Sequence, residues 1–382
     1  MYAPGSPFTI YCVECWNSQD KWDPMAYGRD YDFSKPFFQQ FREFMEKVPR
    51  VSLYQHLNEK SDYTNYSVYL KNSYMVFGGH HYEDCLYYSQ SIYVKDCVDV
   101  GFCKNSEKCY SSLRLNKCYN THFSETAEGC NDSWFLFDCK NCSNCVGCAG
   151  LRNKSFCIYN VQYSPEEYAV KLAELKLGTY TGLQAVGVKA RALSLTIPQK
   201  FAILKNAENS TGDDLENVTN CYGVFNAGQV ENCRYSFFLL ENSHDLYDGD
   251  HIGYSSELVC EMMSGFENNR VAFGNRIYNS HDVFYSDDCH GCSDLFGCIG
   301  LRKKSFCIFN KQYAPEEYKV LVAKIIDQMN ALPFAGANGR VYKFGEFFPI
   351  EISAFAYNET VAHDYFPLPR EEAVGRGYRW HE

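Results

Sequence analysis

The sequence has little positive charge, few methionines and no long apolar run. Its 36 Lys and Arg stand against 47 Asp and Glu, which gives a net charge of −11 and disfavours non-specific binding along a phosphate backbone. No apolar stretch approaches the roughly 18 residues that indicate a membrane-spanning helix. The start, MYAPGSPFTIYC, has neither the charged segment nor the apolar run of a secretion signal. We therefore expect a cytoplasmic protein with no membrane partner.

Short catalytic motifs are also missing. The sequence has no nucleophile elbow, Walker loop, dinucleotide fingerprint, HExxH or deaminase signature. These absences favour a non-enzymatic protein. They do not exclude an enzyme, because polysaccharide-cleaving β-helix enzymes place carboxylates and basic side chains on a solenoid face without a short local motif.

Aromatic residues and cysteines are abundant instead. The 382 residues include 31 Tyr, 28 Phe and 20 Cys, and 46% of them are hydrophobic. Tyrosine and phenylalanine suit the half-buried surface of a pleated sheet, so the composition favours β-structure. Disulfide frameworks belong mostly to short secreted chains. We therefore expect mostly free thiols that pack as small hydrophobic side chains.

The chain contains a tandem duplication. DCKNCSNCVGCAGLRNKSFCIYNVQYSPEEY (138–168) matches DCHGCSDLFGCIGLRKKSFCIFNKQYAPEEY (288–318), with 20 of 30 positions identical from the first cysteine onward. Each copy ends in Pro-Glu-Glu-Tyr, which is typical of a helix start. The predicted segments are a zinc-ribbon-like and helical 1–49, a first copy 50–177, a linker 178–197, a second copy 198–330 and an extended aromatic tail 331–382.

A shorter period runs through each copy. Cysteines recur nine apart at Cys130, Cys139, Cys148 and Cys157, and twelve apart at Cys85, Cys97 and Cys109. Short β-runs between Asn, Asp, Gly and Ser indicate strand–turn units, and a fixed period indicates a solenoid. Two units would give a coil of 18–24 residues with cysteines stacked in inward columns. The predicted fold is mainly β, a tandemly duplicated β-solenoid (β-roll or β-helix) with short capping helices.

The stretch CKNCSNCVGC spaces four cysteines by three residues, at Cys139, Cys142, Cys145 and Cys148. This spacing is typical of metal and iron–sulfur sites. The second copy has Leu295 in the place of Cys145, which would break an obligate four-thiolate site. We favour packed interior thiols, with a metal site or a disulfide as alternatives, and an iron–sulfur cluster is disfavoured.

A second cysteine pair lies outside the repeats. Cys12 and Cys15 in YCVEC, followed by WNSQDKWDP, have the spacing of half a zinc ribbon, in which two ligand pairs complete a tetrahedron. No second pair follows at the usual spacing. The sequence therefore predicts an incomplete zinc site whose remaining ligands come from outside this stretch.

Basic residues are duplicated with the repeats. LRNKSF and LRKKSF carry Arg152, Lys154, Arg302, Lys303 and Lys304. They are candidates for two equivalent patches that bind a phosphate, an acidic protein or nucleic acid. The alternative is a pair of solvated turns with a copied salt bridge.

One acidic, histidine-containing stretch is found only in the second copy. NSHDLYDGDHIGYSSE clusters His244, Asp245, Asp248, Asp250 and His251. Imidazoles and carboxylates at these spacings could hold a divalent cation or perform acid–base chemistry. A polar loop is the alternative.

Three stretches together resemble one family: residues 8–50, the repeats ending LRNKSFCIYNVQYSPEEY, and residues 343–380. Over nearly its whole length the chain is similar to an uncharacterised group of zinc-ribbon-flanked, Cys/Tyr-rich repeat proteins from ultra-small candidate-phylum bacteria, known from metagenomes. Some members carry a CoA-transferase-like name, CaiB/BaiF, but the sequence has no α/β nucleotide-type pattern. The resemblance implies additional cysteine pairs beyond this region and no established activity.

The leading functional prediction is a binding scaffold, zinc-associated in a longer form, that presents a repetitive solenoid face to a protein or nucleic acid and could oligomerise. The first alternative is an enzyme that acts on a carbohydrate or other polymer through the His/Asp cluster. The second alternative is a metal-cluster protein.

Overall fold

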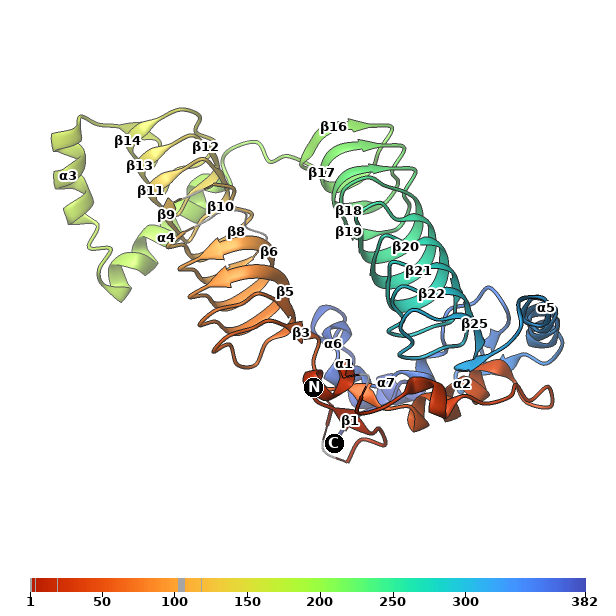
Figure 1. Cartoon of the computed structure of the whole chain (residues 1–382). Helices are drawn as coiled ribbons and strands as arrows, with labels where there is room; N and C mark the ends of the chain where they lie inside the picture. Colours follow the sequence, from red (N-terminus) through yellow and green to blue (C-terminus); the bar gives the residue numbers. More distant parts are fainter. Residues whose placement is uncertain (1, 4, 19, 102–106, 118) are drawn as a thin grey trace. The chain divides into compact units, whose positions relative to one another are not determined.

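The computed structural model describes residues 2–3, 5–18, 20–101, 107–117 and 119–382, and for residues 80 and 88–92 the backbone alone. The chain divides into two compact units. One unit, residues 52–200, holds the first solenoid, and the other combines residues 1–51 with 201–382 and holds the second solenoid (Figure 1). Both solenoids are stacks of short parallel strands, so the predicted mainly-β solenoid is confirmed.

One coil takes twelve residues. In the first solenoid Tyr74 pairs with Leu86, and Leu86 pairs with Val98. In the second solenoid Val271 pairs with Val283 at the same separation. The predicted coil of 18–24 residues is therefore wrong, because a single unit of twelve residues already closes the coil.

The coil is built in steps of three residues. From Lys108 to Tyr159 every third residue has φ between 45° and 72°, a left-handed conformation that is uncommon for residues other than glycine. Asn and Asp tolerate it best among them, which explains the turn residues distributed along the sequence. The residue after each of these points inward, and the described ones from 109 to 148 are all buried. Four such steps make one coil.

The four cysteines of CKNCSNCVGC occupy the four inward positions of one coil, and all four are buried. Columns of inward side chains repeat every twelve residues, as Cys145 and Cys157 do. Cysteines nine apart therefore lie in different columns. A nine-residue step instead joins neighbouring sides of adjacent coils, where Cys139 Sγ donates to the Cys148 carbonyl at 3.6 Å.

Small polar side chains at inward positions satisfy the backbone of the next coil. Ser133 Oγ accepts the Cys145 N–H at 3.2 Å and donates to the Asn131 carbonyl at 2.7 Å. Cys148 Sγ accepts the Asn160 N–H in the same way at 3.4 Å. A buried N–H without a partner costs roughly 1–3 kcal/mol, so serine and cysteine suit these positions better than a hydrocarbon side chain.

The first solenoid ends in an antiparallel turn between its last two strands. Its strands are β3 (Gln55–His56), β4 (Asn65–Val68), β5 (Tyr74–Glu83), β6 (Leu86–Lys95), β7 (Val98–Gly101), β8 (Tyr110–Leu113), β9 (Tyr119–His122), β10 (Glu125–Glu128), β11 (Asn131–Trp134), β12 (Phe137–Lys140), β13 (Ser143–Val146), β14 (Ser155–Ile158) and β15 (Val161–Gln162).

The second solenoid ends in the same kind of antiparallel turn. Its strands are β16 (Leu204–Glu208), β17 (Gly212–Thr219), β18 (Val224–Glu231), β19 (Phe237–Leu239), β20 (Ser243–Gly253), β21 (Glu257–Phe266), β22 (Asn269–Tyr278), β23 (His281–Phe284), β24 (Ser293–Phe296), β25 (Ser305–Ile308) and β26 (Lys311–Gln312).

The second solenoid also contains coils with an extra residue. His244 pairs with Glu257, thirteen residues later, whereas Glu257 pairs with Asn269 after the usual twelve. Tyr254 and Ser255 have consecutive positive φ values of 51° and 64°. The extra residue therefore lies at the corner just before Glu257.

Two helices follow the first solenoid. α3 (Pro165–Glu174) begins with the predicted Pro-Glu-Glu start, and Ser164 and Glu167 form a capping box. The predicted linker contains α4 (Tyr180–Ser194), whose first turn is capped by Thr179. This stretch is thus an ordered helix that packs on the first solenoid, because Val186 and Ala190 are buried on one of its faces.

Segments from both ends of the chain share one core with the second solenoid. α2 (Phe37–Lys47) buries Phe37, Phe38, Phe41 and Phe44 in it. The predicted extended tail, 331–382, forms short elements and contributes Tyr342 to this core, because its aromatic side chains find a partner surface there.

The other elements of this unit are β1 (Ile10–Tyr11), α1 (Val13–Asn17), a 3-10 turn (Pro24–Tyr27), β2 (Arg50–Val51), α5 (Pro315–Ala331), β27 (Phe334–Ala335), β28 (Val341–Tyr342), two 3-10 turns (Ile350–Ile352 and Tyr357–Glu359), α6 (Val361–Tyr365) and α7 (Arg370–Gly375). None of the described helices is long and apolar enough to cross a membrane.

The hydrogen bonds at inward positions predict which substitutions the solenoid tolerates. Ser133→Ala should lower the free energy of unfolding by about 1–3 kcal/mol, because the Cys145 N–H loses its acceptor. Ser133→Cys should cost clearly less, since a thiol already fills equivalent positions. Urea unfolding of both variants tests this, and a cysteine variant as unstable as the alanine variant would contradict it.

Candidate functional site

Large apolar and aromatic side chains line one face of the first solenoid. They belong to two neighbouring outward columns, each repeating every twelve residues. The exposed members, which we call the aromatic face, are Tyr63, Tyr74, Met75, Leu86, Tyr87 and Tyr110. Their rings touch across the two columns, with centroid distances of 5.5 Å for Tyr63–Tyr74 and 6.0 Å for Tyr74–Tyr87. A contiguous exposed apolar patch of this kind marks an interaction site in soluble proteins.

Further along the same columns, α4 covers this surface. A Cβ at Gly187 of α4 would lie 3.2 Å from the Phe135 ring, and Val186 is buried in the same cluster. Phe135 stacks on Phe123 with centroids 4.8 Å apart, and Phe123 contacts Tyr110 at 5.1 Å. The covered surface and the exposed aromatic face are therefore continuous.

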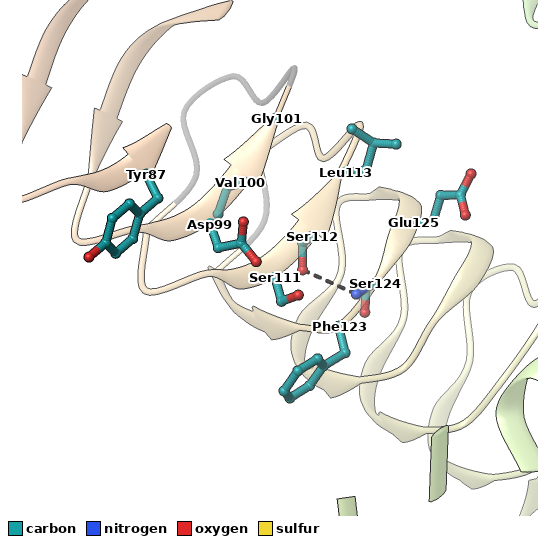
Figure 2. Close-up of a pocket in the computed structure, with 10 residues that line it drawn as sticks. All are labelled: Tyr87, Asp99, Val100, Gly101, Ser111, Ser112, Leu113, Phe123, Ser124 and Glu125. Atoms are coloured by element: carbon teal, nitrogen blue, oxygen red, sulfur yellow. Dashed lines mark hydrogen bonds between the residues drawn. The ribbon is translucent and has the colours of Figure 1, made fainter. Parts of the chain in front are cut away.

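A hollow interrupts the aromatic face between Tyr87 and Phe123. Asp99 and Ser111 occupy the two intermediate coils of this column, and a hollow of about 550 Å³ lies among these residues. Figure 2 shows the rings of Tyr87 and Phe123 at its two ends, with the shorter side chains of Asp99 and Ser111 between them. The surface thus offers flat rings and one recess that could receive a projecting side chain.

Three potential metal ligands converge on the second solenoid. His244 and Asp245 lie on one coil, Glu257 lies beside His244 on the next, and their ligand atoms are all within 4.8 Å of one another. Within the described ranges, no other group of three or more His, Cys, Asp or Glu residues meets this distance. Asn232 donates to Asp245 at 3.1 Å, and Asn269 donates to Glu257 at 2.9 Å.

The hydrogen bond from His244 holds the pKa of Asp245 below its ordinary value. The other predicted members of the acidic cluster lie on the following sides of the coil. His251 Nδ1 is 2.5 Å from an Asp250 carboxylate oxygen, while Asp248 occupies a left-handed corner between the two pairs. The three-residue step therefore divides the five predicted residues among different sides of the coil.

The duplicated arginines form salt bridges within each solenoid. Arg152 Nη2 lies 2.9 Å from Asp138 Oδ1, and Arg302 Nη2 lies 3.2 Å from Asp288 Oδ1. The side chain of Asp138 is 18% exposed, whereas that of Asp288 is 1% exposed. Burial by itself would raise the pKa of Asp288, but Arg302 and Arg276 outweigh it and hold that pKa well below its usual range.

The lysines of these turns are less constrained. Lys154 and Lys303 are exposed, and Lys304 is half-buried. Because both guanidinium groups are engaged by their own chain, the geometry favours the copied salt bridge over a pair of binding patches.

Cys12 and Cys15 lie at the start of α1. Cys12 is exposed and Cys15 is half-buried. Cys12 Sγ accepts the Cys15 N–H at 3.4 Å, and Lys21 Nζ lies 3.9 Å from Cys15 Sγ. Hydrogen bonds from the backbone and the thiol of Cys15 lower the pKa of Cys12, and the same thiol–thiol contact raises the pKa of Cys15. The described residues supply no third ligand within 4.8 Å of this pair, so they do not fit a zinc ion held by this chain alone.

The thiols of CKNCSNCVGC are engaged by the backbone. Cys142 donates to the Lys140 carbonyl and Cys145 donates to the Ser143 carbonyl, both at 3.3 Å. Burial raises the pKa of Cys139 to about 12. A buried thiol that stays protonated is a poor nucleophile, and these contacts are those of packed interior thiols.

Comparisons with known proteins add little. No protein-family model and no curated protein matches the sequence. Among solved structures, a crystal structure from Desulfovibrio desulfuricans G20, whose protein carries a provisional acetyltransferase name, is similar at 8% identity over 80% of each chain, with a TM-score of 0.13.

Two features of the surface were missed in the sequence. Glu257 lies thirteen residues after His244. Only the length of the coil, including its extra residue, shows that the two side chains lie next to each other. Tyr63, Met75 and Tyr87 are spaced by twelve, which the sequence displays, but a predicted coil of 18–24 residues would place them on different sides.

The two salt bridges predict unequal costs of the same substitution. Arg302→Met should lower the free energy of unfolding by about 3 kcal/mol, because it leaves the buried Asp288 carboxylate short of a partner. Arg152→Met should cost no more than about 1 kcal/mol, since Asp138 reaches solvent and also lies 3.3 Å from Lys200 Nζ. Urea unfolding measures both values, when each variant is followed through the unfolding of the unit that carries its substitution.

Acidic pH should reduce the loss of stability caused by Arg302→Met. The pKa of Asp288 is lower in the folded protein than the value of about 3.9 in an unfolded chain, so its ion pair contributes stability at neutral pH that is lost as the pH falls below about 4. The gap between the wild type and Arg302→Met should therefore narrow at acidic pH. An equal cost for both arginine variants, or a gap that widens in acid, would contradict the proposed role of Asp288.

Proposed function

We propose that the protein is a non-enzymatic scaffold whose aromatic face binds an amphipathic helix of a partner protein. The observation that carries this proposal is the continuity of the aromatic face with the surface that α4 covers. A helix already packs on these columns within the chain, and the next coils present the same kind of side chain uncovered.

The way α4 packs indicates the character of the partner. α4 meets the surface through Val186, Gly187 and Ala190, which lie on one face of the helix. Small and aliphatic residues there allow close approach to the rings of Phe135 and Tyr159, since a Cβ at Gly187 would already touch Phe135. A partner helix with a similar stripe at a spacing of three and four residues would meet the exposed coils in the same manner.

The exposure of the tyrosines supports a substantial binding energy. Tyr63 is 60% exposed and Tyr87 is 52% exposed. Large aromatic side chains dominate interface energetics, and tyrosine is enriched among residues that contribute most to binding. The hollow between Tyr87 and Phe123 gives such an interface a specific feature, because one projecting side chain of the partner could fill it.

Charge favours a protein partner over nucleic acid. On an adjoining side of the same coils, Lys71 and Lys95 each lie 3.4 Å from the carboxylate of Glu83. The two lysines thus both pair with a carboxylate of their own column, and the chain carries a net charge of −11. Binding to a phosphate backbone depends on unneutralised basic groups.

Tyr110 and Tyr119 allow a matched test, because each is 44% exposed and only Tyr110 belongs to the aromatic face. A photo-crosslinking residue at position 110 or 119 of the full chain should capture the partner in the native host from position 110 alone. Tyr110→Ala should then weaken binding of the purified partner by about tenfold or more, whereas Tyr119→Ala should leave the affinity unchanged. Titration calorimetry measures both affinities.

Two results would contradict the scaffold. One is equal loss of affinity in both tyrosine variants, which would indicate a general effect on the solenoid. The other is hydrolysis of a polysaccharide that disappears in His244→Ala, which would favour the polymer-acting enzyme and assign chemistry to His244, Asp245 and Glu257.

A further inference from the structure

The cysteine pair at the start of α1 differs from the other cysteines of the chain. Of the 18 cysteines that the structure describes, Cys12 alone is exposed, and only Cys15 and Cys260 are half-buried. The others lie in the solenoid interiors, where Cys139 and Cys142 illustrate the burial. Access to solvent, a condition for thiol chemistry with an external reactant, is thus concentrated at Cys12.

Within the pair, a hydrogen-bond donor is directed at the sulfur of Cys12. The Cys15 N–H points at Cys12 Sγ at 3.4 Å. A backbone donor of this kind stabilises negative charge on the Cys12 sulfur. Lys21 Nζ lies 3.9 Å from Cys15 Sγ but also pairs with the Glu14 carboxylate at 3.1 Å, so the two charges offset each other beside the second sulfur.

The described residues do not complete a zinc site around this pair. Structural zinc takes four ligands, and the described part of the chain brings no third His, Cys, Asp or Glu ligand atom within 4.8 Å of the two sulfurs. Two neighbouring thiols, one of them exposed, are also an arrangement that can exchange with disulfides.

We propose that Cys12 and Cys15 form a redox-active dithiol that is oxidised by thiol–disulfide exchange with an external disulfide. This activity is independent of the binding function of the aromatic face, because the pair lies in the other unit of the chain.

The exchange has two steps. The Cys12 thiolate attacks one sulfur of the external disulfide, which forms a mixed disulfide and releases the other half as a thiolate. Cys15 then loses its proton to solvent and attacks the Cys12 sulfur, which closes the Cys12–Cys15 disulfide and releases the second half. The dithiol is oxidised by two electrons, and the external disulfide is reduced to two thiols.

Exposure fixes the order of these roles. Cys12 is the more exposed residue and meets the reactant first, whereas the half-buried Cys15 resolves the mixed disulfide. The interior cysteines take no part, because solvent does not reach their sulfur atoms. They also supply an internal control, since thiols that stay unreactive report that a variant is folded.

Oxidised glutathione is a suitable probe, with the full chain purified under reducing, oxygen-free conditions and zinc content measured before the reaction. Wild type, Cys12→Ser and Cys15→Ser are exposed to glutathione redox buffers, quenched with acid, alkylated after denaturation and analysed by peptide mass. Wild type should form the Cys12–Cys15 disulfide, and Cys15→Ser should accumulate glutathione on Cys12. Cys12→Ser should react at least about tenfold more slowly, because only the less accessible sulfur is left.

Two outcomes would overturn the proposal. One is the absence of a Cys12–Cys15 disulfide in wild type across the whole range of glutathione ratios, with no mixed disulfide on Cys12 in Cys15→Ser. The other is stoichiometric zinc in the purified wild type that both serine variants lose, which would show that these sulfurs are metal ligands supplied with partners from elsewhere.

Discussion

The whole architecture depends on one backbone constraint, a left-handed residue at every third position. Each such residue turns the chain by one corner, so that four of them close a coil after twelve residues. The coil is consequently narrow, and the following residue always points into a small interior. Most inward side chains there are small or aliphatic, although Tyr82 is also buried in the interior, and the N–H groups directed inward need acceptors. Serine and cysteine meet both requirements, as Ser133 and Cys148 do.

The same constraint organises the outer surface. Because each side chain is repeated directly above itself after twelve residues, outward residues form columns, and contacts within a column link successive coils. The column of Lys71, Glu83 and Lys95 alternates in charge, while Asn220 donates to Asn232 at 3.2 Å in a ladder of amides. A column can also be apolar, and it then offers a continuous strip that a helix covers. α4 does so at one end of the aromatic face.

Chemical reactivity is distributed unequally by this architecture. A solenoid that fills its interior with thiols places them beyond the reach of solvent, and burial raises the pKa of Cys85 to about 11. Cysteine is therefore mostly a packing residue here. The proposed redox pair and the candidate ligand group lie where the regular coil is interrupted or absent: Cys12 precedes the solenoids, and the converging group of His244 and Glu257 lies beside a coil with an extra residue.

The sequence by itself determined the β-solenoid and the helix starts, because turn residues, inward cysteines and Pro-Glu-Glu motifs express local preferences of the backbone. The sequence also has Leu295 in the place of Cys145, which favours a packing role for these cysteines. Only the tertiary structure decided the coil length. The cysteine spacings of nine and twelve residues are both multiples of three, so the sequence fits more than one coil length, and the hydrogen-bonded register between strands selects twelve. No local pattern of residues specifies that register. Three features follow from it: the pairing of His244 with Glu257, the aromatic face and the docking of α4.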